Sequence, residues 1–219
     1  LARAGWAEHG VYYMMPTTEG SINFWSKKPL RSVEDLKGLK IRLWGLFLDT
    51  FQKLGAAPVF LPHEEVYTAL ATGVIDASGT AGNYYMTHKY YEICKYYYTR
   101  SLMVPALSML VSMNAWNALP DDLKAILDQA VRAHRDRRYQ ALMADYGPMY
   151  EKFSEWGTVP IAWSDEDLNK VAAAGLELLP SVAAMSPRNA EAIRIITDFM
   201  KRKGYIKYCL LYTSDAADE

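Results

Sequence analysis

The sequence contains only two cysteines, Cys94 and Cys209, and neither belongs to a CxxC motif or a cluster with histidine. It therefore predicts neither a zinc site nor a framework of disulfides. Long hydrophobic runs are also missing, because the most apolar stretch, residues 102–111, contains a proline and is far shorter than the roughly 20 residues of a membrane-spanning helix. No segment of the sequence is predicted to cross a membrane.

Neither sign of charge is in excess. The chain has 24 Lys and Arg residues against 25 Asp and Glu residues, which gives a formal net charge of -1 at pH 7. Without a basic face, nucleic acid and anionic membrane surfaces are not expected partners. A chain of 219 residues that is 51% hydrophobic can bury a sizeable core. We expect a globular protein whose partner is a small molecule.

The common signatures of catalysis are absent: the sequence has no GxSxG, HExxH, Walker loop or GxGxxG. Asp76 ends a predicted strand beside small residues, a place that suits a general base. An Asp that caps the next turn is the commoner explanation of such a residue. The sequence thus predicts no catalytic residue, no metal site and no cofactor.

Short apolar segments alternate with helical patterns from Ser32 onward. Strands are predicted at residues 39–43, 57–61 and 74–77, with helices between them that end at Gly55 and Gly73. This alternation predicts an α/β fold with parallel strands joined by crossover helices. Residues 78–82 would then form a loop at the carboxyl end of a strand, where open α/β sheets bind ligands.

A long helix is predicted from Pro120 to Trp156, with a break or kink at Gly147-Pro148. Such a helix can run along two lobes and hold them together. Helix starts are predicted at Ser164 and at Ser186.

Arg42 stands on a strand that is predicted to be buried on at least one face. A guanidinium near a core needs a partner, and its planar fork suits a carboxylate held through two hydrogen bonds. An Asp or Glu of the same chain would serve equally well. The 16 tyrosines, crowded around residues 84–98, can line a pocket, although packing between helices and sheet is the commoner role.

Several separated segments resemble one family. Residues 32–42, Ser-Val-Glu-Asp-Leu-Lys-Gly-Leu-Lys-Ile-Arg, are similar to a signature of the TRAP transporter solute-binding proteins, the DctP family. Residues 54–58, 62–70, 73–77 and 114–120 resemble later segments of that family, in the same order. The resemblance extends from about Gly10 to Tyr205.

The resemblance implies a two-lobed α/β fold, like that of periplasmic binding proteins, with a ligand cleft and a long helix bridging the lobes. In that family the strand arginine binds the ligand's carboxylate, which here implies Arg42. Trp25, together with Tyr97, fits the branch that binds 2-oxo acids. Ser78 is a further candidate for the pocket wall.

One departure from that branch is informative. Its members carry a Glu-Trp pair that contacts a metal ion and the ligand, whereas this chain has Gly79 and Thr80 at that place. A metal-bridged 2-oxo acid is therefore not expected. Thr80 can donate one hydrogen bond, and the smaller side chains are expected to leave room for a bulkier acid.

The resemblance also suggests how the chain is divided. Residues 20–106 and 148–205 are assigned to the arginine-bearing lobe, and residues 1–19 and 107–147 to crossing segments and a remnant of the other lobe. We expect the family's first lobe to be largely missing from this chain. Residues 206–219 resemble a translated adapter sequence and are expected to be a non-native tail.

We therefore expect a periplasmic receptor that closes its lobes on a small organic carboxylate: a 2-oxo acid, a hydroxy acid or a dicarboxylate. Its expected partners are this ligand and the membrane permease subunits of a TRAP transporter. A sensor module of the same fold is the alternative, and an enzyme ranks third.

Overall fold

The computed structural model describes residues 1–18, 20–103 and 105–204, so the adapter-like residues 206–219 lie outside the described residues. Two sheets are present in this part: a six-stranded sheet of order β4-β3-β5-β2-β6-β8 and a two-stranded ribbon of β1 and β7. The strands of the larger sheet are Ile22–Ser26 (β2), Lys40–Arg42 (β3), Ala57–Val59 (β4), Ala77–Ala81 (β5), Tyr96–Tyr98 (β6) and Val159–Ile161 (β8).

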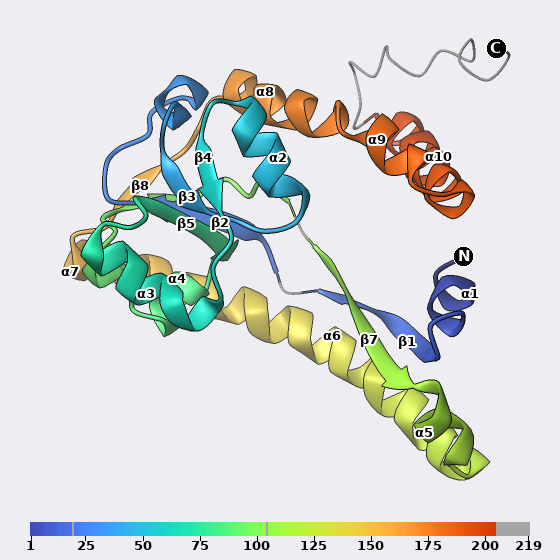
Figure 1. Ribbon diagram of the computed structural model, residues 1–219. Coiled ribbons are helices and arrows are strands. Elements are labelled where there is room, and N and C mark those ends of the chain that lie inside the picture. The colour runs from blue at the N-terminus through green and yellow to red at the C-terminus, as the bar shows by residue number, and fades with distance from the viewer. Residues whose placement is uncertain (19, 104, 205–219) are drawn as a thin grey trace, which may run out of the picture.

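Helices cover both faces of the larger sheet, which confirms the predicted α/β layering (Figure 1). One face packs under α2 (Leu46–Lys53) and α8 (Asp165–Leu176), with a core that includes Phe24, Phe51 and Trp163. The other face packs under the elements α3 (His63–Thr72), α4 (Tyr84–Thr87), η2 (Tyr90–Glu92) and α7 (Phe153–Trp156).

Serines stand at the starts of three helices, two of them at the predicted positions Ser164 and Ser186. Ser32 and Asp35 form a capping box around the short 3-10 helix η1, Val33–Leu36. The side chain of Ser164 accepts a hydrogen bond from the backbone N–H of Asp167. Ser186 does the same for α10, Pro187–Arg202, and a short helix that the sequence pattern did not reveal, α9 (Leu179–Ala184), precedes it.

The sheet is mixed, and the strands of the predicted alternating pattern form its parallel part. Strand β2 runs antiparallel to both β5 and β6, while β3 is parallel to β4 and β5, and β6 is parallel to β8. β2 precedes the alternating pattern that starts at Ser32, so it does not belong to a strand–helix–strand unit, and only such a unit enforces parallel pairing.

The prediction of a strand at residues 74–77 followed by a loop at residues 78–82 was wrong, because β5 is Ala77–Ala81. All five of its residues are buried. Their small side chains resemble a loop in composition, but here they leave room for the aromatic side chains of β2, Phe24 and Trp25, which lie opposite Gly79 and Ser78.

The predicted long helix is present as α6, Asp121–Glu151, with Pro148 inside it. The break falls at Lys152, before α7, and not at Gly147-Pro148. Residues 84–92 form two short helices, α4 and η2, because Lys89 adopts a left-handed conformation (φ 56°) between them.

The ribbon lies beside the amino-terminal part of α6 and apart from the larger sheet (Figure 1). In it, β1 (Val11–Thr18) and β7 (Ala106–Ser112) pair antiparallel between two short helices, α1 (Ala2–Ala7) and α5 (Met113–Ala118). An ion pair between Glu8 and Arg188 ties the end of α1 to α10. Among the described residues, no helix has the length and apolar character needed to cross a membrane.

Candidate functional site

One row of side chains crosses four strands on a single face of the larger sheet. Arg42 on β3 lies opposite Ser78 on β5, Ser78 lies opposite Trp25 on β2, and Trp25 lies opposite Tyr97 on β6. Residues that face each other across a ladder project to the same side of the sheet. Three of the predicted site residues, Arg42, Ser78 and Trp25, therefore lie in one continuous row.

A second row begins two residues further along β5, on the same face. Thr80 lies opposite Asn23, and both are buried. The amide nitrogen of Asn23 donates to the carbonyl of Tyr98 at 2.9 Å, and its amide oxygen accepts from the hydroxyl of Ser21 at 2.9 Å. Asn23 is thus held by the protein, whereas Thr80 supplies a hydroxyl next to the first row.

Gly79 lies on the opposite face of the sheet from Ser78 and Thr80. A β-carbon at Gly79 would lie 3.1 Å from Cδ2 of Leu43 and 3.3 Å from Cβ of Phe24, which are core residues of the opposite face. The alternation of side chains along a strand puts Gly79 on the face away from Ser78 and Thr80. Its small size serves packing on that face.

Arg42 ends β3, and its side chain is held in one orientation. Its Nε donates a hydrogen bond to the carbonyl of Leu61 at 3.0 Å. The guanidinium carbon lies 5.3 Å from the ring centre of Trp44 and 6.0 Å from that of Phe60. The residue is 4% exposed, so a carboxylate that reached it would meet a partly desolvated charge in which hydrogen bonds are strong.

Trp25 is a core residue more than a pocket wall. It is fully buried, and its ring stacks at 5.1 Å on Tyr90 and at 6.3 Å on Tyr97. Burial also raises the pKa of Tyr90 to about 12, so its hydroxyl stays neutral. Trp25 and the tyrosines around it therefore continue the row of Arg42 into the core beneath α3 and η2.

Trp44 and Phe60 were missed by sequence reasoning. Trp44 follows Arg42 by two residues, a spacing that places two side chains on one side of an extended chain, and this signal was available. No local pattern of the sequence predicts that Phe60 lies near Arg42, because this contact depends on the pairing of β3 with β4.

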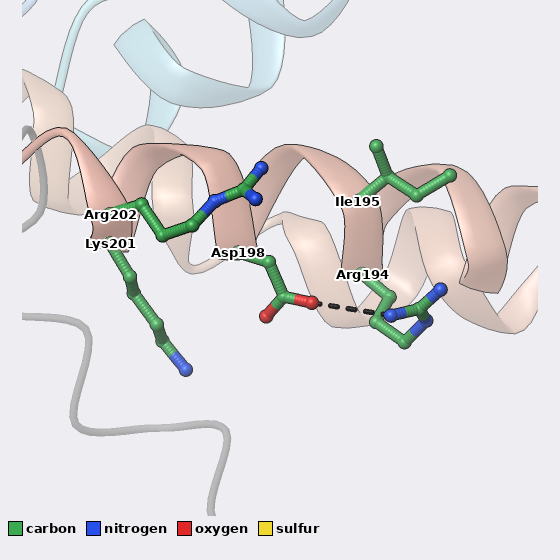
Figure 2. Close-up of a pocket in the computed structure, with 5 residues that line it drawn as sticks. All are labelled: Arg194, Ile195, Asp198, Lys201 and Arg202. Atoms are coloured by element: carbon green, nitrogen blue, oxygen red, sulfur yellow. Dashed lines mark hydrogen bonds and ion pairs between the residues drawn. The ribbon is translucent and has the colours of Figure 1, made fainter.

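An open hollow on α10 is a separate feature and shares no residue with the rows described above. Figure 2 shows its lining residues, Arg194, Ile195, Asp198, Lys201 and Arg202, all on one helix. Arg194 is paired there with Asp198 at 3.2 Å. Over the part of the chain that the structure describes, no group of three or more His, Cys, Asp and Glu side chains is placed to hold a metal ion.

The carboxylate of Asp76 contacts neighbouring parts of the sheet. It accepts a hydrogen bond from the backbone N–H of Lys40 at 3.4 Å and lies 4.0 Å from the ammonium of Lys27. These contacts join the start of β5 to β3 and β2, as expected of a carboxylate that stabilises a strand end.

The fold is that of the periplasmic solute-binding proteins. A TRAP periplasmic solute-binding protein from Colwellia psychrerythraea, solved with bound calcium and pyruvate, superimposes with a TM-score of 0.83 at 29% identity. The match covers 93% of this chain and 64% of that one.

The chain belongs to the DctP family, the bacterial extracellular solute-binding proteins of family 7, whose model matches residues 3–185. It is 37% identical over 117 residues to a monocarboxylate 2-oxoacid-binding periplasmic protein of Nostoc sp., covering 52% of this chain and 32% of that protein. It is 28% identical over 159 residues to the sialic acid-binding periplasmic protein SiaP of Vibrio cholerae, covering 72% of this chain and 48% of that protein. The chain thus spans less than half the length of these two relatives. The family is one of transport proteins and not of enzymes.

Proposed function

We propose that the protein is the periplasmic receptor of a TRAP-type transporter and that Arg42 binds the carboxylate of its ligand. The observation that carries this proposal is the setting of Arg42: a buried guanidinium at the carboxyl end of a strand, with its orientation set by Leu61 and with the hydroxyl residues Ser78 and Thr80 on the same face. The names of similar proteins support it, since one binds 2-oxo acids and another was solved with pyruvate.

The receptor works by closing two lobes and performs no covalent chemistry. Residues 20–106 and 148–205 form the arginine-bearing lobe, and residues 1–19 and 107–147 belong to the other lobe and the crossings. The separation of the β1–β7 ribbon from the larger sheet supports this division. The membrane permease subunits of the transporter are the partners that receive the ligand.

The test is a thermal-shift screen of organic acids on the full-length gene product. A ligand that binds only the folded state stabilises it by about 2.7 kcal/mol at one hundred times its Kd. We expect a selective shift with one class of carboxylate. Titration of that acid into Arg42→Ala should show a Kd that is weaker by about 100-fold or more, because a buried charge pair is lost.

Two variants separate binding from folding. Arg42→Lys keeps the charge but loses the planar fork, so it should bind more weakly than the wild type. Arg100→Ala removes an arginine of the same sheet region that pairs with Asp165 on the surface, and it should bind normally. A folded Arg42→Ala protein with an unchanged Kd would contradict the proposal.

A further inference from the structure

The guanidinium of Arg42 lies between two aromatic rings that come from different elements. Trp44 belongs to the turn between β3 and α2, and Phe60 follows the last residue of β4. Their ring centres are 5.3 Å and 6.0 Å from the guanidinium carbon. Trp44 is braced from behind by Phe47, with ring centres 5.9 Å apart. The two rings thus flank the proposed carboxylate anchor.

Charged side chains are usually exposed and large apolar ones buried, and around Arg42 the opposite holds. Arg42 is 4% exposed, whereas Phe60 is 63% exposed. Leu46, at the start of α2, and Val59, at the end of β4, are 49% and 37% exposed. Exposed apolar side chains on the elements that flank a buried charge are typical of a surface that something apolar covers.

Beside Arg42, the polar side chains that β5 contributes to the same face are small. Ser78 and Thr80 each offer one hydroxyl, and Asn23 already bonds the carbonyl of Tyr98 and the hydroxyl of Ser21. A polyhydroxylated acid would need several donors and acceptors, since each hydroxyl that leaves water without a partner costs free energy. An acid with an apolar group would need only the arginine and one or two hydroxyls.

Resting on the proposed function, we infer that Trp44 and Phe60 determine specificity, selecting carboxylates that carry an aromatic or branched apolar group. The carboxylate binds the guanidinium, and the apolar group lies along the exposed side of the two rings. Covering apolar surface is favourable in proportion to its area, so a phenyl or isobutyl group gains affinity there that a methyl group does not.

The inference is tested by calorimetric titration of the full-length gene product with four acids. Phenylpyruvate and 4-methyl-2-oxopentanoate are the apolar probes, pyruvate is the small probe, and gulonate is the polyhydroxylated probe. We expect the two apolar acids to bind at least tenfold more tightly than pyruvate, and gulonate to bind most weakly.

Variants of the two rings then assign the preference. Trp44→Ala and Phe60→Ala should each weaken binding of the apolar acids about tenfold, while the Kd for pyruvate changes less than twofold. Trp6→Ala, which removes an exposed tryptophan of α1, is the matched control and should leave every Kd unchanged. Unfolding midpoints within a few degrees of the wild type show that the variants fold.

The outcomes separate the two proposals. If acids bind and depend on Arg42, but gulonate or pyruvate binds best, or Trp44→Ala weakens all acids equally, the specificity inference is overturned and the proposed function stands. If no acid binds the wild-type protein, the proposed function fails, and the specificity inference fails with it.

Discussion

The six-stranded sheet and the ribbon with its part of α6 differ in how well they cover their own apolar surface. The sheet has a buried cluster on each face. In the ribbon, by contrast, the residues of β7 alternate between exposed and half-buried, and Leu123, Ile126 and Leu127 of α6 are exposed by 37–58%. The sheet region therefore has its own core, whereas the ribbon region presents apolar side chains that its neighbours in the described structure do not cover.

This difference indicates which region contributes most to the stability of the fold. Hydrophobic burial is the main favourable term in folding, so most of the free energy of unfolding should come from the sheet region. The ribbon region is held mainly by backbone pairing, by the end of α6 and by the surface ion pair between Glu8 and Arg188. Substitutions of the same kind in the two regions should then have very different effects.

The largest expected difference concerns two leucines. Leu70 of α3 is fully buried, and Leu123 of α6 is 42% exposed. Leu70→Ala should lower the free energy of unfolding by about 2–5 kcal/mol, because it removes buried methyl groups and leaves a cavity. Leu123→Ala should lower it by less than about 1 kcal/mol. Urea denaturation of both variants measures these changes. Equal decreases in the free energy of unfolding would contradict the proposed difference between the two regions.

Two glycines provide the next contrast. A β-carbon at Gly82 would lie 2.6 Å from Oδ1 of Asn23 and 2.8 Å from Cε1 of Tyr146, and it would also meet the hydroxyl of Tyr97. Gly82→Ala should therefore cost about 1–3 kcal/mol through overpacking.

Gly147, in α6, is the matched control, since nothing other than its chain neighbours lies within 4 Å of its β-carbon position. Gly147→Ala should change the free energy of unfolding by less than about 1 kcal/mol, because the higher helix propensity of alanine is offset by the crowding of its β-carbon against the ring of Pro148. Thermal unfolding should thus show a clearly lower midpoint for Gly82→Ala and a midpoint near that of the wild type for Gly147→Ala. A neutral Gly82→Ala variant would show that the junction between β5 and α6 is looser than described.

The smallest expected effect is the dependence of the sheet region's stability on pH through Asp167. Hydrogen bonds from the Ser164 hydroxyl and from the backbone N–H of Val33 lower the pKa of Asp167. A lowered pKa contributes stability that is present above the unfolded value of about 4 and is lost as pH falls through the folded value. Asp167→Asn should cost about 1–2 kcal/mol at pH 7.

The difference between the wild type and Asp167→Asn should then shrink as pH falls below about 4, where the wild-type carboxylate takes up a proton. Urea midpoints measured from pH 7 to pH 2.5 follow this change. A gap that stays constant with pH would mean that the charge of Asp167 contributes nothing.

Sequence reasoning predicted the long helix, the helix starts at Ser164 and Ser186, and the strands β3 and β4, because these depend on local patterns. The capping serines and the glycines after α2 and α3 mark element ends within a few residues. β5 escaped because its small residues pack between neighbours that the pattern does not reveal. The face on which Gly79 lies, and the meeting of Phe60 with Arg42, depend on register between strands, and no local pattern encodes that register. The roles of Ser78, Thr80 and Arg42 in ligand binding stay predictions.

The position of β8 has a consequence for the order of folding. Its pairing with β6 brings Thr99 and Ile161 together across 62 positions of the chain, and the ribbon strand β7 and all of α6 are synthesised between them. Contacts between residues so far apart in the sequence form late, and they lower the rate of folding. Until Val159–Ile161 has emerged from the ribosome, the three tyrosines of β6 form an unpaired sheet edge, which is a site for self-association. Any fragment that ends before Val159 is therefore expected to aggregate.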